Sequence, residues 1–286
     1  MKLLRYGESG RERPGALDRN GEIRDLSALV SDISSATLSG PLLASLAAVD
    51  IERLPRVSGA VRLGPCVGNP SKFVCIGLNY RDHAREVGLP IPEEPVLFQK
   101  ATSSICGPHD PIRLPRSSAK TDWEVELGVV IGTRASHVNE QDALAHVAGY
   151  CVVNDVSERA FQMERGGQWT KGKSADTFGP VGPWLVTRDD VRDPQALDIW
   201  LKVDGRSYQR SNTDQMVFGV ARLVSYVSEF MTLLPGDIIA TGTPAGVGLA
   251  QRPTPVFLAA GQTVTLGIAG LGEQSHVCEQ AASESK

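Results

Sequence analysis

Residues 121–132 read Thr121-Asp122-Trp123-Glu124-Val125-Glu126-Leu127-Gly128-Val129-Val130-Ile131-Gly132, an apolar run that also carries acidic residues. The apolar continuation after Glu126 predicts a β-strand. Because residues two apart in a strand point to the same face, Glu124 and Glu126 are expected to lie side by side. Two adjacent like charges favour a cation between them, and Mg²⁺, Mn²⁺ and Ca²⁺ bind carboxylate oxygens. A solvated edge strand is the alternative interpretation of Glu-x-Glu alone.

The composition is that of an ordinary globular enzyme. The chain has 286 residues, of which 41% are hydrophobic and 22% charged, enough for one large domain with a small appendage. Its formal net charge of -4 disfavours a general binder of nucleic acid or of membrane surfaces. No apolar run approaches the ~20 residues that a membrane span needs. We therefore expect neither a nucleic-acid partner nor a membrane association.

The cysteines and the first residues indicate the compartment. Five cysteines are scattered along the chain without a Cys-x-x-Cys pair, which disfavours a zinc ribbon or a disulfide framework. The chain turns polar directly after its first residues, so no signal-peptide core is expected. These features predict a protein of the reducing cytoplasm.

The fold class expected from the sequence is α+β and mainly β. A small N-terminal α+β domain is expected over residues 1–65, followed by a catalytic domain over 66–286. In the first part, Asn20-Gly21 predicts the turn of a hairpin. Helices are expected over 42–48, 143–147 and 218–230, and short strands, separated by glycines and prolines, at 72–77, 96–100, 148–153, 198–203, 237–241 and 262–268.

A candidate general base follows the strand at 72–77. His83 and Glu86 lie three residues apart, and this spacing makes them neighbours on one helical turn. A carboxylate beside an imidazole orients the ring and raises its basicity, so the pair can activate water. A weak exposed ion pair is the alternative. The charged, proline-rich residues 81–95 are expected either to form a lid that orders on ligand binding or to be a fixed loop.

Three further positions can complete a site. Asp155 follows a strand, where it can be a third metal ligand or the N-cap of a helix-like segment over 156–163. Lys173 lies among glycines and small polar residues and can hold an oxyanion, although a loop lysine is by default a solubilising charge. Thr243 lies in a Gly-rich loop whose hydroxyl and backbone N–H groups can face a carboxylate. This loop lacks the lysine of a phosphate-binding P-loop, which disfavours nucleotide binding.

Together, five motifs resemble the fumarylacetoacetate hydrolase family and occur in that family's order. The resemblance covers about residues 70–270, and the set is specific where any single motif is not. The motifs are Asn79-Tyr80-x-x-His83-x-x-Glu86, Glu124-x-Glu126-Leu127, Asn154-Asp155, Lys173-Ser174-x-Asp176-x-Phe178-x-Pro180-x-Gly182-Pro183 and Thr241-Gly242-Thr243-Pro244-x-Gly246-Val247-Gly248.

The resemblance implies a mixed β-roll core, a homodimer or a dimer of dimers, and a divalent cation, Mg²⁺ with Mn²⁺ as the alternative. It implies that Glu124, Glu126 and Asp155 hold this cation. Arg159 and Gln162 match family positions that approach the substrate. The remaining site residues expected are His83, Glu86 and Lys173 for catalysis, and Lys173 and Thr243 for binding the substrate.

One departure from the family pattern narrows the reaction. Fumarylacetoacetase proper has a further acidic ligand just upstream of its catalytic histidine, whereas residues 64–81 contain no Asp or Glu. The site thus resembles the three-carboxylate branch, which acts on small 2-oxo acids and contains hydrolases, decarboxylases and isomerases. The pair His83 and Glu86 favours hydrolysis. In that reaction water attacks the C4 carbonyl of a 2,4-diketo acid, Lys173 holds the oxyanion, and pyruvate is released.

The N-terminal part points to a particular substrate. Residues 2–7, 14–18 and 167–173 resemble the group that hydrolyses 2,4-diketo-3-deoxy-L-rhamnonate or L-fuconate to pyruvate and lactate. Alternatives are an acylpyruvate or fumarylpyruvate hydrolase, and an oxaloacetate decarboxylase or tautomerase on the same site. A ureidoglycolate lyase and a non-catalytic metal-binding protein rank lower.

Overall fold

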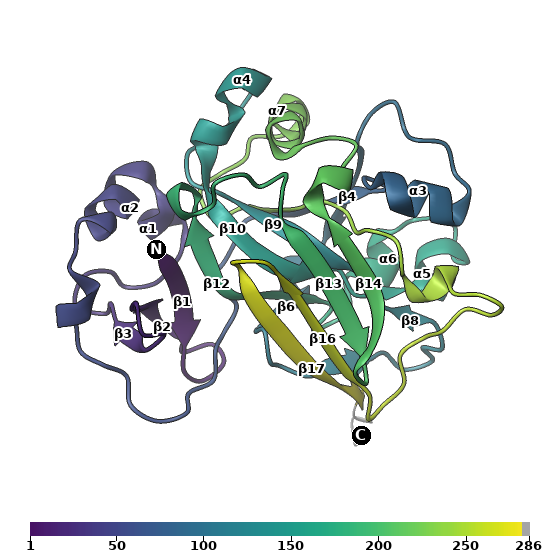
Figure 1. Ribbon diagram of the computed structural model, residues 1–286, viewed down its shortest axis with the longest axis horizontal. Helices are drawn as coiled ribbons and strands as arrows, with labels where there is room; N and C mark the ends of the chain where they lie inside the picture. The colour runs from purple at the N-terminus through teal and green to yellow at the C-terminus, as the bar shows by residue number, and fades with distance from the viewer. Residues whose placement is uncertain (282–286) are drawn as a thin grey trace.

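The computed structural model describes residues 1–281, whose strands form three sheets (Figure 1). The largest sheet has ten strands, and all but one of them stand in a single row. In spatial order this row is β3 (Ile23–Asp25), β2 (Arg13–Leu17), β1 (Lys2–Tyr6), β12 (Gly179–Thr187), β10 (Val147–Asn154), β9 (Val125–Ile131), β15 (Ile238–Ala240), β4 (Phe73–Gly77) and β5 (Val96–Lys100), while β6 (Ile105–Cys106) pairs with β12.

Two smaller sheets complete the strands. The five-stranded sheet lies in front of β9 and β10 in Figure 1, and the third sheet is a short pair. Strand β15 pairs in parallel with β4 but antiparallel with β9, so the large sheet is mixed. Because strands dominate the described elements, the predicted α+β, mainly β class is confirmed. The smaller sheets comprise β14 (Arg206–Asn212), β13 (Asp198–Val203), β16 (Thr263–Ile268), β17 (Gly272–Gln280) and β7 (Ile112–Leu114), and the pair β11 (Ser157–Glu158) with β8 (Thr121–Asp122).

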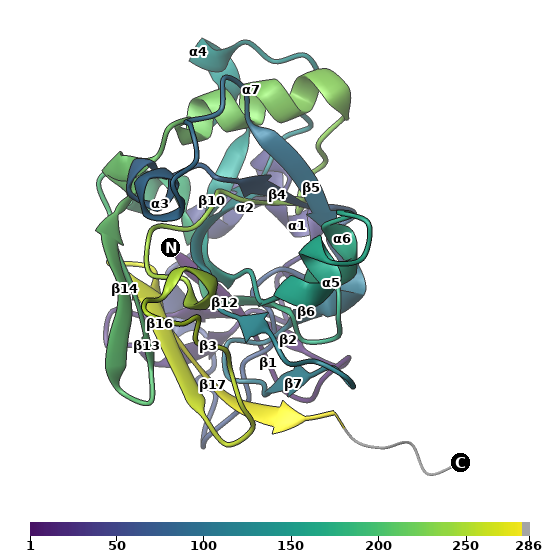
Figure 2. The same ribbon diagram turned by 90° about the vertical axis from the view of Figure 1, so that its right-hand side faces the viewer.

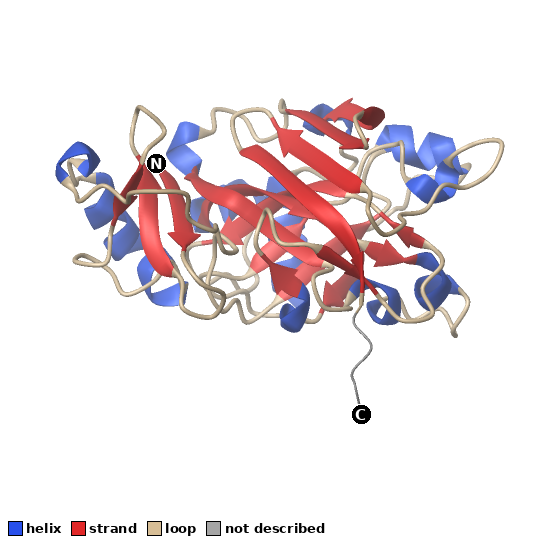
Figure 3. Cartoon of the chain, turned by 90° about the horizontal axis from the view of Figure 1, so that it is seen from below, coloured by secondary structure: helices blue, strands red, loops and turns tan. Residues whose placement is uncertain are grey.

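The α-helices are short and lie around the strands, as the view from below shows (Figure 3). Helices α1 and α2 lie beside β1, β2 and β3, whereas α3, α5 and α6 lie at the opposite end of the molecule (Figures 1 and 2). Their bounds are α1 (Ser35–Leu38), α2 (Gly40–Ala47), α3 (Arg81–Val87), α4 (Glu140–Ala143), α5 (Arg159–Met163), α6 (Thr170–Lys173) and α7 (Val220–Phe230). None of the helices formed by residues 1–281 has the length and apolar character of a membrane span.

The centre of the large sheet is buried on both faces. Along β4, Phe73 and Cys75 point into a core shared with β1 and α1, whereas Val74 and Ile76 point into a core shared with α7, β13 and β16. This alternation follows from the two-residue period of a strand, and covering both faces explains why β4 is apolar at each position. The sheet therefore gives the site a rigid floor.

The elements predicted from the sequence are largely confirmed. The hairpin at Asn20-Gly21 forms, since Leu17 pairs with Ile23. The helix expected over 143–147 begins earlier, because α4 (Glu140–Ala143) continues as a 3₁₀ turn over Leu144–His146 and Val147 already belongs to β10. A strand forms at each predicted position: the predicted range 72–77 contains β4, 96–100 is β5, 148–153 lies within β10, 198–203 is β13, 237–241 contains β15 and 262–268 contains β16. The other predicted helices, 42–48 and 218–230, correspond to α2 and α7.

The edge-strand interpretation of Glu-x-Glu is wrong. Strand β9 lies between β10 and β15, and each of its residues is buried. Residues 1–65 join the large sheet, because Lys2 and Leu3 of β1 pair with Val186 and Leu185 of β12. The division of the chain at residue 65 stays a prediction.

We expect Ile239→Ala to lower the free energy of unfolding by about 2–5 kcal/mol, because Ile239 is fully buried between β9 and β4. Urea unfolding followed by circular dichroism measures the loss. Val277→Ala is the control: Val277 is 49% exposed, and its truncation is expected to change stability by less than about 0.5 kcal/mol. Equal losses in the two variants would contradict the central position of Ile239.

Candidate metal centre and active site

Three carboxylates meet where β9 and β10 lie side by side. Val125 pairs with Asn154, so the residues that flank them, Glu124 and Asp155, become neighbours. The N–H of Asp155 donates to the carbonyl oxygen of Glu124 at 2.9 Å. One carboxylate oxygen from each of Glu124, Glu126 and Asp155 lies within 4.8 Å of the others, and all three residues are buried. The structure therefore brings together the three residues that were predicted to converge.

Buried cations neutralise two of the three carboxylates. Nζ of Lys173 donates to Glu124 Oε2 at 2.6 Å and to Asp155 Oδ2 at 2.8 Å. Nη2 of Arg159 donates to Glu124 Oε1 at 2.6 Å. On the other side, Nζ of Lys100 donates to Asp155 Oδ1 at 2.5 Å. Such pairing is needed because an unpaired buried charge is strongly unfavourable.

Glu126 is the carboxylate without a cationic partner among the described residues. Its Oε2 accepts a hydrogen bond from the N–H of Gly242 at 2.8 Å. Burial and the neighbouring carboxylates of Asp155 and Glu124 raise the pKa of Glu126 well above its usual value. For Glu124, burial acts in the same direction, but Arg159 and Lys173 outweigh it and lower the pKa to about 2. The charge of Glu126 is therefore the one that the cationic side chains of the centre leave unpaired among the described residues.

The donor set fits a hard divalent cation, since carboxylate oxygens are the ligands that Mg²⁺ and Mn²⁺ prefer. Counted formally, four buried carboxylates face three buried cationic side chains, which leaves one negative charge. A divalent cation would reverse this surplus to one positive charge, which suits an anionic substrate. The groups are Glu124, Glu126, Asp155 and Asp122 on one side, and Lys100, Lys173 and Arg159 on the other.

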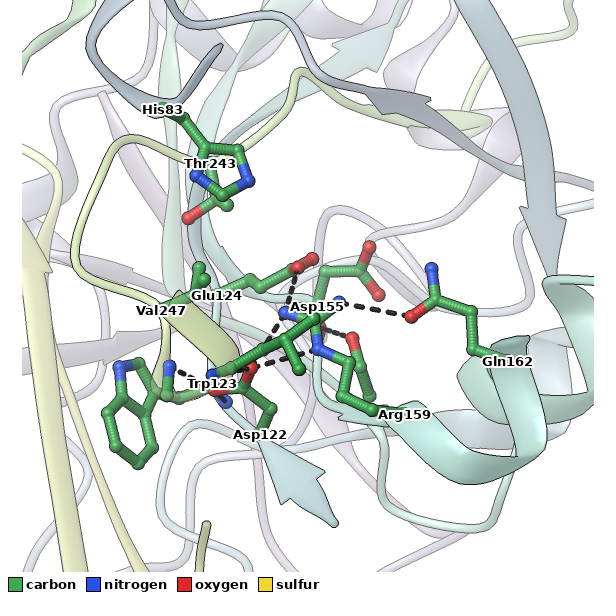
Figure 4. Close-up of polar contacts among 12 residues, drawn as sticks. His83, Asp122, Trp123, Glu124, Asp155, Arg159, Gln162, Thr243 and Val247 are labelled. Atoms are coloured by element: carbon green, nitrogen blue, oxygen red, sulfur yellow. Dashed lines mark hydrogen bonds and ion pairs between the residues drawn. The ribbon is translucent and has the colours of Figure 1, made fainter. Parts of the chain in front are cut away.

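The predicted pair of His83 and its carboxylate partner Glu86 forms on α3. Nδ1 of His83 lies 3.0 Å from Glu86 Oε2. Glu86 is itself held, because its Oε1 accepts the N–H of Gly246 at 2.9 Å. Gly246 has a φ of +107°, a conformation that favours glycine, so this N–H depends on the residue type. Figure 4 shows the His83 ring above the carboxylates, on the opposite side from Arg159.

Lys173 retains one N–H that the carboxylates do not use, since an ammonium group has three donors and two point at Glu124 and Asp155. Its Nζ lies 5.0 Å from the centre of the Phe98 ring. The Phe98 ring in turn packs edge-on against Trp169, with 5.3 Å between the ring centres. One aromatic wall thus borders the lysine.

The predicted substrate contacts lie at the centre but are engaged with the protein. In Arg159, Nε donates to Asp122 Oδ2 at 2.9 Å and Nη1 donates to Gln162 Oε1 at 3.1 Å. The hydroxyl of Thr243 donates to the carbonyl oxygen of Val125 at 2.9 Å. The substrate-binding roles of Arg159, Gln162 and Thr243 stay predictions, as do the catalytic roles of His83, Glu86 and Lys173.

The alternative role of Asp155 as an N-cap is wrong. The helix after it, α5, begins at Arg159, and its N-cap is Glu158, whose side chain accepts the N–H of Ala160 at 3.2 Å. The intervening residues form β11, so the helix-like segment predicted from 156 starts three residues later. The side chain of Asp155 caps no helix and belongs to the acidic cluster instead.

Sequence reasoning missed three residues of the centre. Lys100 was expected only as the end of a strand, and a lysine that closes an apolar strand was its one signal. Asp122 precedes Glu124 by two positions, so the strand period alone places it on the same side. Gln209 of β14 has no such signal, although its Oε1 accepts the N–H of Val125 at 3.0 Å.

Comparison with protein-family models matches residues 72–278 to "Fumarylacetoacetate (FAA) hydrolase C-terminal", a segment that contains every residue of the centre. The chain belongs to the fumarylacetoacetate hydrolase family. A relative from Burkholderia ambifaria, described as "Putative hydrolase", is 66% identical over 274 residues, which cover 96% of this chain and 97% of that protein.

Solved structures of family members share the fold. A fumarylacetoacetate hydrolase from psychrophilic Exiguobacterium antarcticum is 36% identical, with a TM-score of 0.87 over 98% of this chain and 99% of that one. Maleylpyruvate hydrolase from Sphingobium sp. SYK-6, solved with manganese(II) and pyruvate, is 30% identical, with a TM-score of 0.82 over 99% and 100%. A probable 2-hydroxyhepta-2,4-diene-1,7-dioate isomerase from Mycobacterium abscessus is 30% identical, with a TM-score of 0.85 over the same shares.

We expect Mg²⁺ or Mn²⁺ to raise the melting temperature of chelator-treated protein, because a ligand that binds only the folded chain stabilises it by mass action. Glu126→Gln is expected to remove most of this rise, since the amide keeps an oxygen for Gly242 N–H but loses the negative charge. Glu140→Gln, at an exposed site, serves as control in the same fluorimetric scan. An undiminished rise in the Glu126 variant would exclude this carboxylate as a ligand.

Proposed function

We propose that the protein is a divalent-metal-dependent hydrolase that cleaves the C3–C4 bond of a 2,4-diketo acid and releases pyruvate. The observation that carries this proposal is the pair His83 and Glu86, held beside three converging carboxylates by the N–H of Gly246. The proposal is supported by the likeness to maleylpyruvate hydrolase, whose structure holds manganese(II) and pyruvate. When bound by Glu124, Glu126 and Asp155, Mg²⁺ or Mn²⁺ would supply Lewis-acid polarisation of the 2-oxo acid.

His83 acts as the general base. Its Nδ1–H donates to Glu86, which fixes the tautomer and leaves the lone pair of Nε2 for a water proton. Glu86 cannot swing away without losing the N–H of Gly246. The water gives its proton to Nε2 and its oxygen bonds to C4 of the substrate, whose carbonyl becomes an oxyanion.

Lys173 stabilises that oxyanion with the N–H that the carboxylates leave unused. As the C4 carbonyl re-forms, the C3–C4 bond breaks and its electron pair moves to the pyruvate portion. The proton taken up by His83 then reaches C3. One water is consumed, and the products are a carboxylic acid and pyruvate.

The narrower substrate that we propose is 2,4-diketo-3-deoxy-L-rhamnonate or L-fuconate, which would yield pyruvate and lactate. Its support is the resemblance of residues 2–7, 14–18 and 167–173 to the group that acts on these acids. The last of these segments places Trp169 against Phe98, which borders Lys173. The homodimer or dimer of dimers, the cytoplasmic location and the lid over residues 81–95 remain predictions that accompany this assignment.

We expect His83→Ala to lower turnover by about 10²–10⁴-fold, the usual contribution of a positioned base. Pyruvate release, followed with a coupled dehydrogenase, measures the loss, and a Mn²⁺ titration is expected to be unchanged. His109→Ala, at an exposed position, is the control and should keep full turnover. A decarboxylase or tautomerase on the same site needs no activated water, so undiminished turnover in the His83 variant would favour that rival.

The substrate assignment predicts a rank order. We expect the deoxy sugar diketo acids to have a higher kcat/KM than fumarylpyruvate, an unsubstituted acylpyruvate, oxaloacetate or ureidoglycolate, with all activity lost in chelator. The panel is run on one protein preparation with and without added Mg²⁺. Faster reaction of the unsubstituted acylpyruvate would overturn the narrow substrate but leave the hydrolase intact, whereas no turnover of any diketo acid would overturn the hydrolase.

A further inference from the structure

Asp122 is a fully buried carboxylate surrounded by hydrogen-bond donors. Its Oδ1 accepts the N–H of Trp123 at 2.8 Å and that of Gly248 at 2.6 Å. Its Oδ2 accepts the N–H of Leu249 at 2.9 Å and Nε of Arg159 at 2.9 Å. Nη2 of Arg159 also lies 2.8 Å from Oδ2. Both oxygens of this side chain are therefore committed.

One half of these contacts reaches the acidic cluster. Arg159 donates to Asp122 through Nε and to Glu124 Oε1 through Nη2, at 2.6 Å. The planar guanidinium thus sets the position of Glu124 relative to Asp122. Figure 4 shows this chain of contacts running from Asp122 through Arg159 towards Glu124.

The other contacts of Asp122 connect it, through a loop, to Glu86, the partner of His83. Gly248 and Leu249 end a loop whose Gly246 N–H holds Glu86 and whose Gly242 N–H holds Glu126. The loop packs closely on Asp122, because a Cβ on Gly248 would lie 2.7 Å from its Oδ1. Asp122 thus anchors this loop close to the N–H of Gly246 that holds Glu86.

We propose that Asp122 is a positioning residue that sets the metal ligands and the His83 base relative to each other. It acts through Arg159 on Glu124 and through the loop 242–249 on Glu86. The inference rests on the proposed function, since it assigns a role within that same site. Residues that orient ligands typically contribute about 10–100-fold to metal affinity or activity.

A second buried aspartate provides a matched control. Asp237 is also fully buried and accepts hydrogen bonds from Ser71 Oγ, Lys72 N and Nζ, and Leu234 N. Among the described residues, none of these donors contacts the acidic cluster or the pair His83 and Glu86. In either aspartate, replacement by Asn turns one oxygen into a donor that faces other donors, so the loss of stability should be alike.

The test compares Asp122→Asn with Asp237→Asn in the absence of substrate. Isothermal titration with Mn²⁺ is expected to show a Kd raised about 10–100-fold in the Asp122 variant and unchanged in the Asp237 variant. Hydrogen exchange is expected to quicken over 242–249 and α3 in the Asp122 variant alone. A purely structural role would move stability in both variants and neither of these two readouts.

Each outcome decides the inference. A wild-type Kd and unchanged exchange in folded Asp122→Asn overturn it, while the proposed function stands. If wild-type protein itself binds no Mn²⁺, the proposed function fails and this inference fails with it. If Asp122→Asn does not fold, Arg159→Lys replaces it, because lysine keeps the charge but loses the planar guanidinium that joins Asp122 to Glu124. A raised Mn²⁺ Kd in that variant supports the inference, and an unchanged one overturns it.

Discussion

The structure depends on the burial of like charges in one place. Glu124, Glu126 and Asp155 are removed from water within 4.8 Å of one another, an arrangement that repulsion and desolvation both oppose. Lys100 and Lys173 offset part of this cost, and both are as deeply buried as the carboxylates they serve. What remains is a deficit of positive charge, which a divalent cation would more than offset; the positive charge that would result suits an anionic substrate.

The sheet and the segments around it contribute different groups to the site. Strands β9 and β10, which are buried along their whole length, bring Glu124, Glu126 and Asp155 together at their paired ends. The groups that we propose to act on water, His83 and Glu86, come instead from α3, and Gly246 of the loop after β15 donates to Glu86. A rigid centre combined with a base on a separate element suits a reaction in which a substrate must enter between the two.

The sequence predicted those features that depend on local spacing. Glu124 and Glu126 were found from the two-residue period of a strand, and His83 with Glu86 from the turn of a helix. Lys100 and Gln209 were not found, because each bonds to a residue more than fifty positions away in the sequence. Thr243 was predicted from its Gly-rich loop as a substrate contact, but no local pattern shows that its hydroxyl bonds to the carbonyl of Val125.

The register of β9 against its two neighbours has an evolutionary consequence. Because side chains alternate along a strand, a shift of one residue in the register of β9 would turn Glu126 towards the opposite core. Mutational drift is thereby confined to substitution in these strands, and length variation to the connecting segments. New substrate preferences in descendants of this protein are accordingly expected to arise from loops such as the one that carries Trp169, with the acidic floor inherited unchanged.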